Sequence, residues 1–297
     1  MDSMLILVLA AAVIVGITLG LLGGGGSILM VPLLTYVAGL EAKEAIATSL
    51  FVVAVTSLFS LLPHARAGNI RWGIGAIFGA TGMVGAFLGG LLGGLLPATV
   101  LMIAFAVMML ATASAMVRGR KKVASTDAPR VRPVGKIVLD GLLVGLVTGL
   151  VGAGGGFLVV PALALLGGLS MPLAVGTSLM VIALKSFAGL GGYLTSTAID
   201  WPLALSITVA AVLGSFIGAR FTARIPEAAL RQGFGYFVLA MGVAVLAQEL
   251  PGLAGWITLG VGLPAVLLLA LCTMVPRLAA RCPLARRTPT TADALDK

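Results

Sequence analysis

Two glycine-rich segments are the parts of this sequence best suited to bind a small anion. They are residues 20–27 (GLLGGGGS) and residues 149–156 (GLVGAGGG). Each glycine in a helix interior costs about 1 kcal/mol relative to alanine, so we expect a helix break at each run. Exposed backbone N–H groups and the positive end of the following helix would then face one spot. The alternative is that these glycines only allow close helix crossing.

Hydroxyl pairs and one lysine supply further anion-binding groups. Thr48-Ser49 and Thr177-Ser178 open the apolar runs that follow each glycine run, where hydroxyls either cap a helix or donate to a ligand. Lys185 lies seven residues after Ser178, on nearly the same helix face. A lysine at this depth costs roughly 2.5 to 3.5 kcal/mol to insert, and the apolar runs offer it no obvious carboxylate partner. The pattern therefore predicts a bound anion beside Lys185.

The predicted substrate-binding residues are the glycines of the two runs, the hydroxyl groups and the lysine: Gly23, Gly24, Gly25, Gly26, Ser27, Thr48, Ser49, Gly152, Gly154, Gly155, Gly156, Thr177, Ser178 and Lys185. The single histidine, His64, ends a segment, and neither it nor Cys272 and Cys282 has metal-site spacing. We therefore expect no catalytic residue, metal or cofactor.

The composition predicts an all-α integral membrane protein. The chain has 297 residues, 60% of them hydrophobic and 10% charged, with a mean hydropathy of +1.16. A soluble domain of this composition would expose too much apolar surface. Residues 1–4 lack the basic start of a signal peptide, so we expect the first run to remain. The runs of spanning length are Met4–Leu22, Ala45–Leu62, Trp72–Leu96, Thr99–Val117, Ile137–Val151, Leu173–Leu194, Trp201–Ala219, Phe234–Ala247 and Trp256–Val275.

The sequence repeats itself at an offset of 129 residues. Residues 20–97 align with residues 149–226 without a gap, and 25 of these 78 positions are identical. The informative matches are of the rarer residue types, such as Trp72 with Trp201 and Pro32 with Pro161. The chain is therefore built from two related halves.

The loop charges predict that the second half is inverted relative to the first. The formal net charge of +9 lies in loops beside apolar runs, which indicates topology rather than nucleic-acid binding. The loop at residues 64–71 carries two arginines, whereas its counterpart at 193–200 carries none and one aspartate. The turn around Pro97 is uncharged, whereas its counterpart carries Arg220, Arg224 and Arg231. The alternative is a parallel repeat with uninformative loop charges.

The inverted arrangement defines the predicted parts of the chain. These are a first repeat (1–117), a basic cytoplasmic linker (118–136), a second repeat (137–249), an additional span (250–276) and a basic cytoplasmic tail (277–297). Each repeat has five apolar segments, and its glycine motif joins a broken or re-entrant pair. Inversion would bring the two glycine breaks toward the middle of the membrane, as in many secondary transporters.

The two motifs GLLGGGGSILMVP and GLVGAGGGFLVVP, each followed by a Thr-Ser-Leu triplet, resemble the paired signatures of the TauE/SafE family of membrane transporters. The likeness covers Gly16 to about Gln248 and leaves out the last span. The resemblance implies export of sulfite or of an organosulfonate such as sulfoacetate, with both motifs lining the path.

We therefore expect a multi-pass exporter of a small sulfur oxyanion in the plasma (inner) membrane, with its C-terminus in the cytoplasm. The expected partners are the small anionic substrate and the lipid bilayer. We expect no binding of nucleic acid, and the sequence is compatible with a homo-oligomer. The alternative is a cation-coupled importer or a permease for another small organic anion. An enzyme is disfavoured because catalytic groups are missing.

Overall fold

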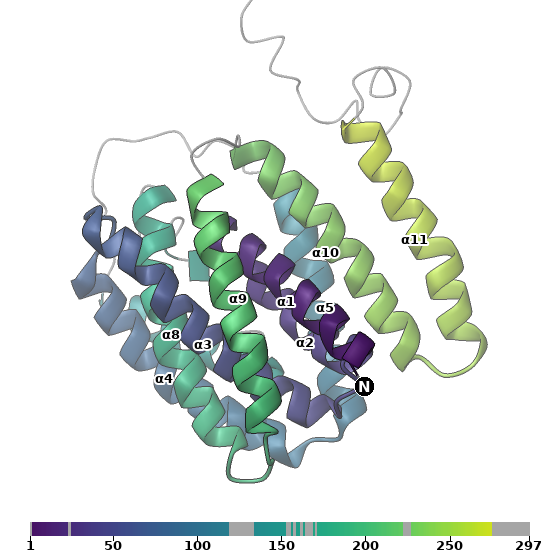
Figure 1. Ribbon diagram of the computed structural model, residues 1–297, viewed down its shortest axis with the longest axis horizontal. Coiled ribbons are helices and arrows are strands. Elements are labelled where there is room, and N and C mark those ends of the chain that lie inside the picture. The colour runs from purple at the N-terminus through teal and green to yellow at the C-terminus, as the bar shows by residue number, and fades with distance from the viewer. Residues whose placement is uncertain are drawn as a thin grey trace, which may run out of the picture.

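The computed structural model is an all-helical bundle (Figure 1). It describes residues 2–22, 25–118, 134–152, 156, 159–160, 163, 169, 171–221 and 227–274. The predicted linker at 119–133, the tail from 275 onward and four predicted site residues, Gly23, Gly24, Gly154 and Gly155, lie outside the described residues. The elements are α1 (Asp2–Leu22), η1 (Gly25–Leu29), α2 (Met30–Pro32), η2 (Leu33–Val37), α3 (Ala42–Arg66), α4 (Trp72–Leu95), α5 (Ala98–Arg118), α6 (Val134–Val151), α8 (Met171–Tyr193), α9 (Trp201–Phe221), α10 (Glu227–Glu249) and α11 (Leu253–Met274).

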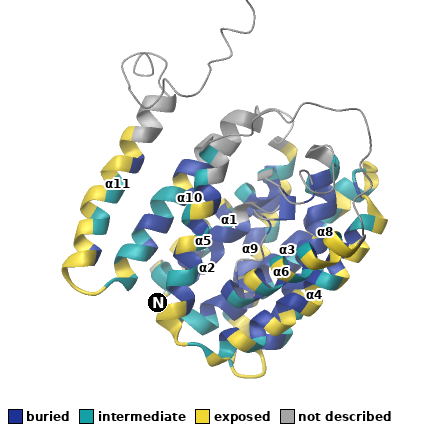
Figure 2. Cartoon of the chain, turned by 180° about the vertical axis from the view of Figure 1, so that it is seen from behind, coloured by how far each residue is buried: buried dark blue, intermediate teal, exposed yellow. Residues whose placement is uncertain are grey.

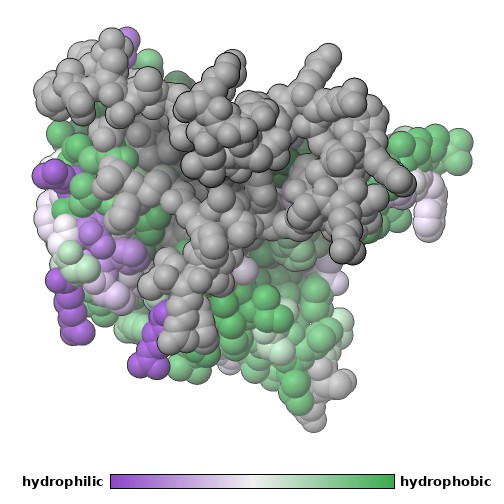
Figure 3. Space-filling view, turned by 90° about the horizontal axis from the view of Figure 1, so that it is seen from above, coloured by the Kyte–Doolittle hydropathy of each residue, from purple (hydrophilic) through white to green (hydrophobic). Residues whose placement is uncertain are grey.

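The helices follow from the uniform apolarity of the chain. Within the described residues, five helices are long and apolar enough to cross a membrane: Met4–Leu21, Ala42–Arg66, Trp72–Leu95, Leu173–Tyr193 and Trp201–Arg220. Large apolar side chains are exposed along α4 and α11, whose exposed residues are yellow in Figure 2. Figure 3 shows the same apolar character over much of the described surface in view, with hydrophilic side chains gathered toward one edge. The chain is therefore a multi-pass membrane protein.

Glycines bring helices from the two halves of the chain into backbone contact. A Cβ atom on Gly85 of α4 would lie 2.1 Å from Leu142 O of α6. A Cβ on Gly214 of α9 would likewise lie 2.2 Å from Val13 O of α1. Because only glycine fits at such approaches, α1 packs on α9 and α6 packs on α4. Gly214 and Val13 are the repeat counterparts of Gly85 and Leu142, so the two contacts are equivalent.

Helices α3 and α8 cross the centre of the bundle in opposite directions. A Cβ on Gly176, near the start of α8, would lie 3.2 Å from His64 Cβ near the end of α3. A Cβ on Gly189, near the end of α8, would lie 3.6 Å from Leu50 Cδ1 near the start of α3. Interpolating between these contacts places Lys185 at mid-depth on α8, within about two residues of the level of Thr56 on α3. Thr56 is also the repeat counterpart of Lys185.

Helix α11 lies at the edge of the bundle and packs on α10 (Figure 1). A Cβ on Gly255 would lie 2.4 Å from Ala247 O, and a Cβ on Gly262 would lie 2.7 Å from Val243 Cγ1, so the two helices run antiparallel. Trp256 on its outer face is 73% exposed. Helix α11 therefore lies against α10 at the outside of the bundle.

Candidate functional site

The first glycine motif separates α1 from a short irregular helical segment. Helix α1 ends at Leu22, and the chain continues as the 3₁₀ segment η1 from Gly25 through Gly26 to Leu29. Ser27 is fully buried in η1. The π-type turn η2 follows, so backbone irregularity extends to Val37. Irregular helical backbone of this kind is common at functional positions.

The second glycine motif contains a left-handed residue directly after the end of α6. Helix α6 ends at Val151, and Gly152 has φ +73°, which favours glycine. A Cβ at this position would lie 2.2 Å from Ile46 Cγ2 of α3. The Tyr193 hydroxyl donates to the carbonyl oxygen of Leu150 at 2.5 Å and so fixes the end of α6. Gly156 is buried.

The two helix ends lie toward opposite ends of the bundle, which corrects the expectation that the glycine breaks meet at mid-depth. Helix α1 ends beside Ser215 in α9, and α6 ends beside Ile46 in α3. Helices α3 and α9 run parallel, because Phe51 makes an edge-to-face contact with Trp201 at 5.4 Å and Phe59 meets Phe216 at 6.5 Å between ring centroids. The ends are thus separated by about thirteen residues, or roughly 20 Å along α3.

The physical reason for this separation is helix length. Helix α1 has 21 residues and α6 has 18, or roughly 31 and 27 Å at the helical rise. Each helix therefore crosses most of the hydrocarbon core before it reaches its glycines.

The Thr-Ser pairs lie inside helices, so the capping interpretation is wrong. Helix α3 begins at Ala42 with Glu41 as its N-cap residue, and α8 begins at Met171. The apolar runs had suggested later starts because charged or polar residues precede them. Thr48 and Ser49 thus fall in the second turn of α3, and Thr177 and Ser178 hold the equivalent place in α8.

The hydroxyls of these pairs tie the two halves of the chain together. Ser49 Oγ lies 2.7 Å from Gly152 O and 2.9 Å from Ile46 O, and its proton can be donated to either carbonyl. Thr177 Oγ1 accepts a bond from the Arg71 backbone N–H at 3.0 Å. Ser178 Oγ donates to the carbonyl of its own helix, three residues earlier, at 2.7 Å. Ser49 and Thr177 therefore serve as contacts between repeats.

Lys185 is the one charged side chain among the buried polar residues of the described core, with 1% exposure. Its Nζ donates to Thr148 Oγ1 of α6 at 3.0 Å. This bond corrects the expectation of a lysine without a protein partner. Among the described residues, no ion pair involves Lys185.

The Thr148 bond leaves most of the hydrogen-bonding capacity of the ammonium unused. Thr148 Oγ1 lies 2.7 Å from Val144 O, to which it donates its own proton, and so it accepts from Lys185. An ammonium has three N–H donors, and the described residues satisfy one of them. The other N–H groups could donate to an anionic ligand, which would also balance the charge.

Sequence reasoning missed Thr148, although the internal repeat carries a signal for it. The counterpart of Thr148 is the apolar Leu19, and the counterpart of Lys185 is Thr56. Both residues of the hydrogen-bonded pair are thus more polar than their repeat counterparts. A comparison of the two halves for polar residues opposite less polar counterparts therefore identifies both Thr148 and Lys185.

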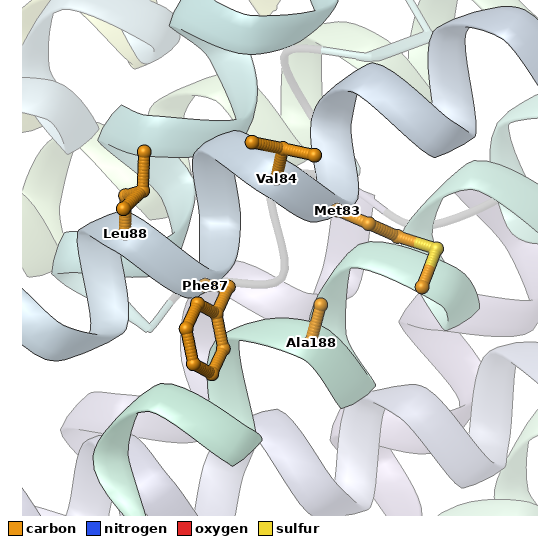
Figure 4. A pocket seen from close by; sticks show the side chains of 5 residues that line it. All are labelled: Met83, Val84, Phe87, Leu88 and Ala188. Atoms are coloured by element: carbon orange, nitrogen blue, oxygen red, sulfur yellow. The ribbon is translucent and has the colours of Figure 1, made fainter.

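The pocket on the outer surface of the described bundle is apolar and is not suited to bind an anion. A shallow apolar pocket on the outer face of α4 and α8 is lined by Met83, Val84, Phe87, Leu88 and Ala188 (Figure 4). These side chains carry no donor for an anion. Within the described part of the chain, no group of three or more His, Cys, Asp or Glu residues could hold a metal ion.

Comparison with known proteins places this chain among membrane transporters. The family model described as "Sulfite exporter TauE/SafE" matches residues 8–245. A "Probable membrane transporter protein" of Xylella fastidiosa strain 9a5c is 33% identical over 247 residues, which cover 82% of this chain and 95% of the relative. The "Probable membrane transporter protein YdhB" of Bacillus subtilis is 30% identical over 228 residues, covering 76% and 93% respectively. A similarly named protein of Methanocaldococcus jannaschii is 29% identical over 260 residues, covering 81% and 96%. No solved structure gives a significant match.

Proposed function

Because this chain belongs to the TauE/SafE sulfite exporter family, whose members are membrane transporters, we propose that it exports a small sulfur oxyanion such as sulfite or an organosulfonate. The proposed location is the plasma (inner) membrane. Transport involves binding and release without covalent chemistry, so no catalytic residue is assigned.

The observation that carries this proposal is the buried side chain of Lys185. It lies at mid-depth on α8, is 1% exposed and has a single neutral partner among the described residues. Inserting a lysine at this depth costs roughly 2.5 to 3.5 kcal/mol, and one bond to a threonine offsets part of that cost. A bound oxyanion supplies both the counter-charge and acceptors for the remaining N–H groups.

The packing supports an inverted repeat around this lysine. Helices α3 and α8 are repeat counterparts and run antiparallel, which is the relation that inversion requires. The same repeat relates α1 to α6 and α4 to α9, so the packed pair α1–α9 corresponds to the packed pair α6–α4. An axis through the α3–α8 crossing would pass beside Thr56 and Lys185, where inverted-repeat transporters bind their substrates.

Alternating access would then expose Lys185 to one side of the membrane at a time. The glycine motifs and Thr-Ser pairs lie nearer the ends of the bundle, so we assign them to the openings of the path rather than to its centre. In this scheme the linker, the tail and the end of α3 at Arg66 are cytoplasmic. An inside-negative potential favours outward anion movement by about 2.3 kcal/mol per charge per 100 mV, so export does not require a coupled ion.

The test is anion flux through the purified protein in proteoliposomes. The rate of efflux of radiolabelled sulfite and sulfoacetate should be higher from vesicles that contain the protein than from protein-free vesicles. The rate should rise further when the vesicle interior is made negative. Sulfate and an amino acid serve as comparison solutes. Flux that needs an inward sodium or proton gradient would instead support the cation-coupled importer. The absence of any anion flux, with the protein correctly inserted, would reject the proposal.

A further inference from the structure

Buried hydroxyl groups in this bundle divide into two classes. In most helices the hydroxyl bonds to a carbonyl of its own preceding turn, the usual arrangement for serine and threonine in apolar helices. Thr112 Oγ1 donates to Met108 O at 2.8 Å, and Thr208 Oγ1 donates to Ala204 O at 2.6 Å. The half-buried Ser114 Oγ does the same with Leu110 O at 2.7 Å. These groups need no ligand.

The second class consists of buried hydroxyls that have no hydrogen-bond partner among the described residues. Five groups of this kind lie on the two central helices: Thr48, Thr56, Ser57 and Ser60 on α3, and Ser186 on α8. All five residues are at most 5% exposed. A buried polar group without a partner is costly, and in native proteins it indicates a water, an ion or a substrate.

Spacing places Ser57 on the face of α3 that meets α8. Leu50 and His64 both approach α8, next to Gly189 and Gly176 respectively. Ser57 is seven residues from each of them, so it lies on the same face midway between. Ser60 lies between Ser57 and His64, one turn from each.

The face of α8 that meets α3 carries Ser186. It is one turn before Gly189, the residue of α8 that approaches Leu50 of α3. The antiparallel register places Ser186 level with Val53, about one turn from Ser57. Ser186 is also the neighbour of Lys185 in the chain. The unpartnered hydroxyls thus form a line from His64, at one end of the bundle, to the level of Lys185.

We propose that Ser57, Ser60 and Ser186 line one half of the substrate path, from the His64 end of α3 to Lys185. This inference rests on the proposed function and extends it, because it names the surface along which the oxyanion moves. Hydroxyls donate to an oxyanion and replace its hydration without binding it too tightly, as conduction requires. A series of neutral donors that ends at one cation suits a small anion with several acceptor oxygens.

Cysteine accessibility tests this path. In a Cys272→Ser, Cys282→Ser background, Ser57→Cys and Ser60→Cys are treated with a membrane-impermeant anionic methanethiosulfonate in vesicles of both orientations. Thr112→Cys is the matched control, because Thr112 is buried and bonded within α5. Sulfoacetate serves as the protecting anion, since sulfite itself cleaves the mixed disulfide that the reagent forms.

We expect both cysteines on α3 to react at least tenfold faster than the control, and from the His64 side only. Sulfoacetate should slow their reaction several-fold and leave the control unchanged. Reaction rates equal to that of Thr112→Cys, or equal rates from both sides, would overturn the proposed path. Anion flux without this labelling would reject the path and retain the function. Labelling and protection without flux would reject export and retain an anion-binding path.

Alanine variants give an independent readout if a cysteine variant fails to insert. Ser57→Ala and Ser60→Ala should each raise the KM for sulfoacetate flux by roughly three- to tenfold. Ser114→Ala, which removes a hydroxyl already bonded to its own helix, should leave KM unchanged. Equal KM values in all three variants would remove these hydroxyls from the path.

Discussion

Replacing Lys185 by methionine is the perturbation that tests the proposed anion site most directly. Methionine keeps the length and apolar stem of the side chain but removes the ammonium and its bond to Thr148. A charge-assisted hydrogen bond contributes about 1.5 to 3 kcal/mol, so anion affinity should fall roughly 10- to 150-fold. The free energy of unfolding should not fall by a comparable amount, because the substitution also relieves a lysine insertion cost of about 2.5 to 3.5 kcal/mol.

The assay is anion-dependent stabilisation of the purified protein. A ligand that binds the folded state raises stability by RT ln(1 + [L]/Kd), so the shift of the unfolding midpoint across a sulfoacetate titration reports Kd. Lys43→Met is the matched control. Lys43 Nζ also makes a single neutral hydrogen bond, to Gly94 O at 2.7 Å, but it is half-buried and lies roughly 17 Å along α3 from the level of Lys185.

The two variants should behave differently if Lys185 holds the anion. Lys43→Met should retain the wild-type Kd, whereas Lys185→Met should show little stabilisation at concentrations that saturate the wild type. An unchanged Kd in a stably inserted Lys185→Met variant would refute the assignment. Equal losses in both variants would mean that overall charge, rather than this site, controls binding.

Three further predictions follow from the packing. Gly152→Ala should prevent stable folding, since φ at this position is +73° and the new Cβ would lie 2.2 Å from Ile46 Cγ2. Size-exclusion chromatography in detergent would detect the loss of folded protein, and a monodisperse product would contradict the prediction. Tyr193→Phe removes a 2.5 Å bond to the backbone of α6 and should lower the free energy of unfolding by about 1 kcal/mol, visible in thermal unfolding. Cysteines at Ala67 and Thr195, in counterpart loops, should be labelled by an impermeant reagent from opposite sides of the membrane; labelling from one side would exclude the inverted repeat.

Much of the helical architecture could be predicted from the sequence because it depends on local composition. Apolar runs between charged or Pro-containing turns fixed most helix bounds to within a few residues. The glycine run after Leu22 likewise coincides with the end of α1, because consecutive glycines destabilise a helix regardless of tertiary context.

The candidate site could be predicted only in part, because it depends on contacts between distant segments. Lys185 was identified from its charge within an apolar run, but its partner Thr148 is 37 residues earlier on another helix. The predicted depth of the glycine breaks is wrong because it depends on how far α1 and α6 extend through the bundle before they reach their glycines. The unpartnered state of Ser57 and Ser60 is invisible in a sequence, where they resemble any other serines in a helix.

Helix α1 of the first half packs on α9 of the second half, and α6 of the second half packs on α4 of the first. This pairing has a consequence for the order in which the protein assembles during synthesis. Helix α1 emerges from the ribosome early, yet its glycine-lined partner surface on α9 begins only at Trp201. At translation rates of about 5 to 20 residues per second, the interval between the synthesis of α1 and that of α9 is on the order of 10 to 40 s. During this interval the newly inserted helix is held by lipid or by the insertion machinery. A chain severed in the linker should therefore yield two fragments that are stable only when both are synthesised together.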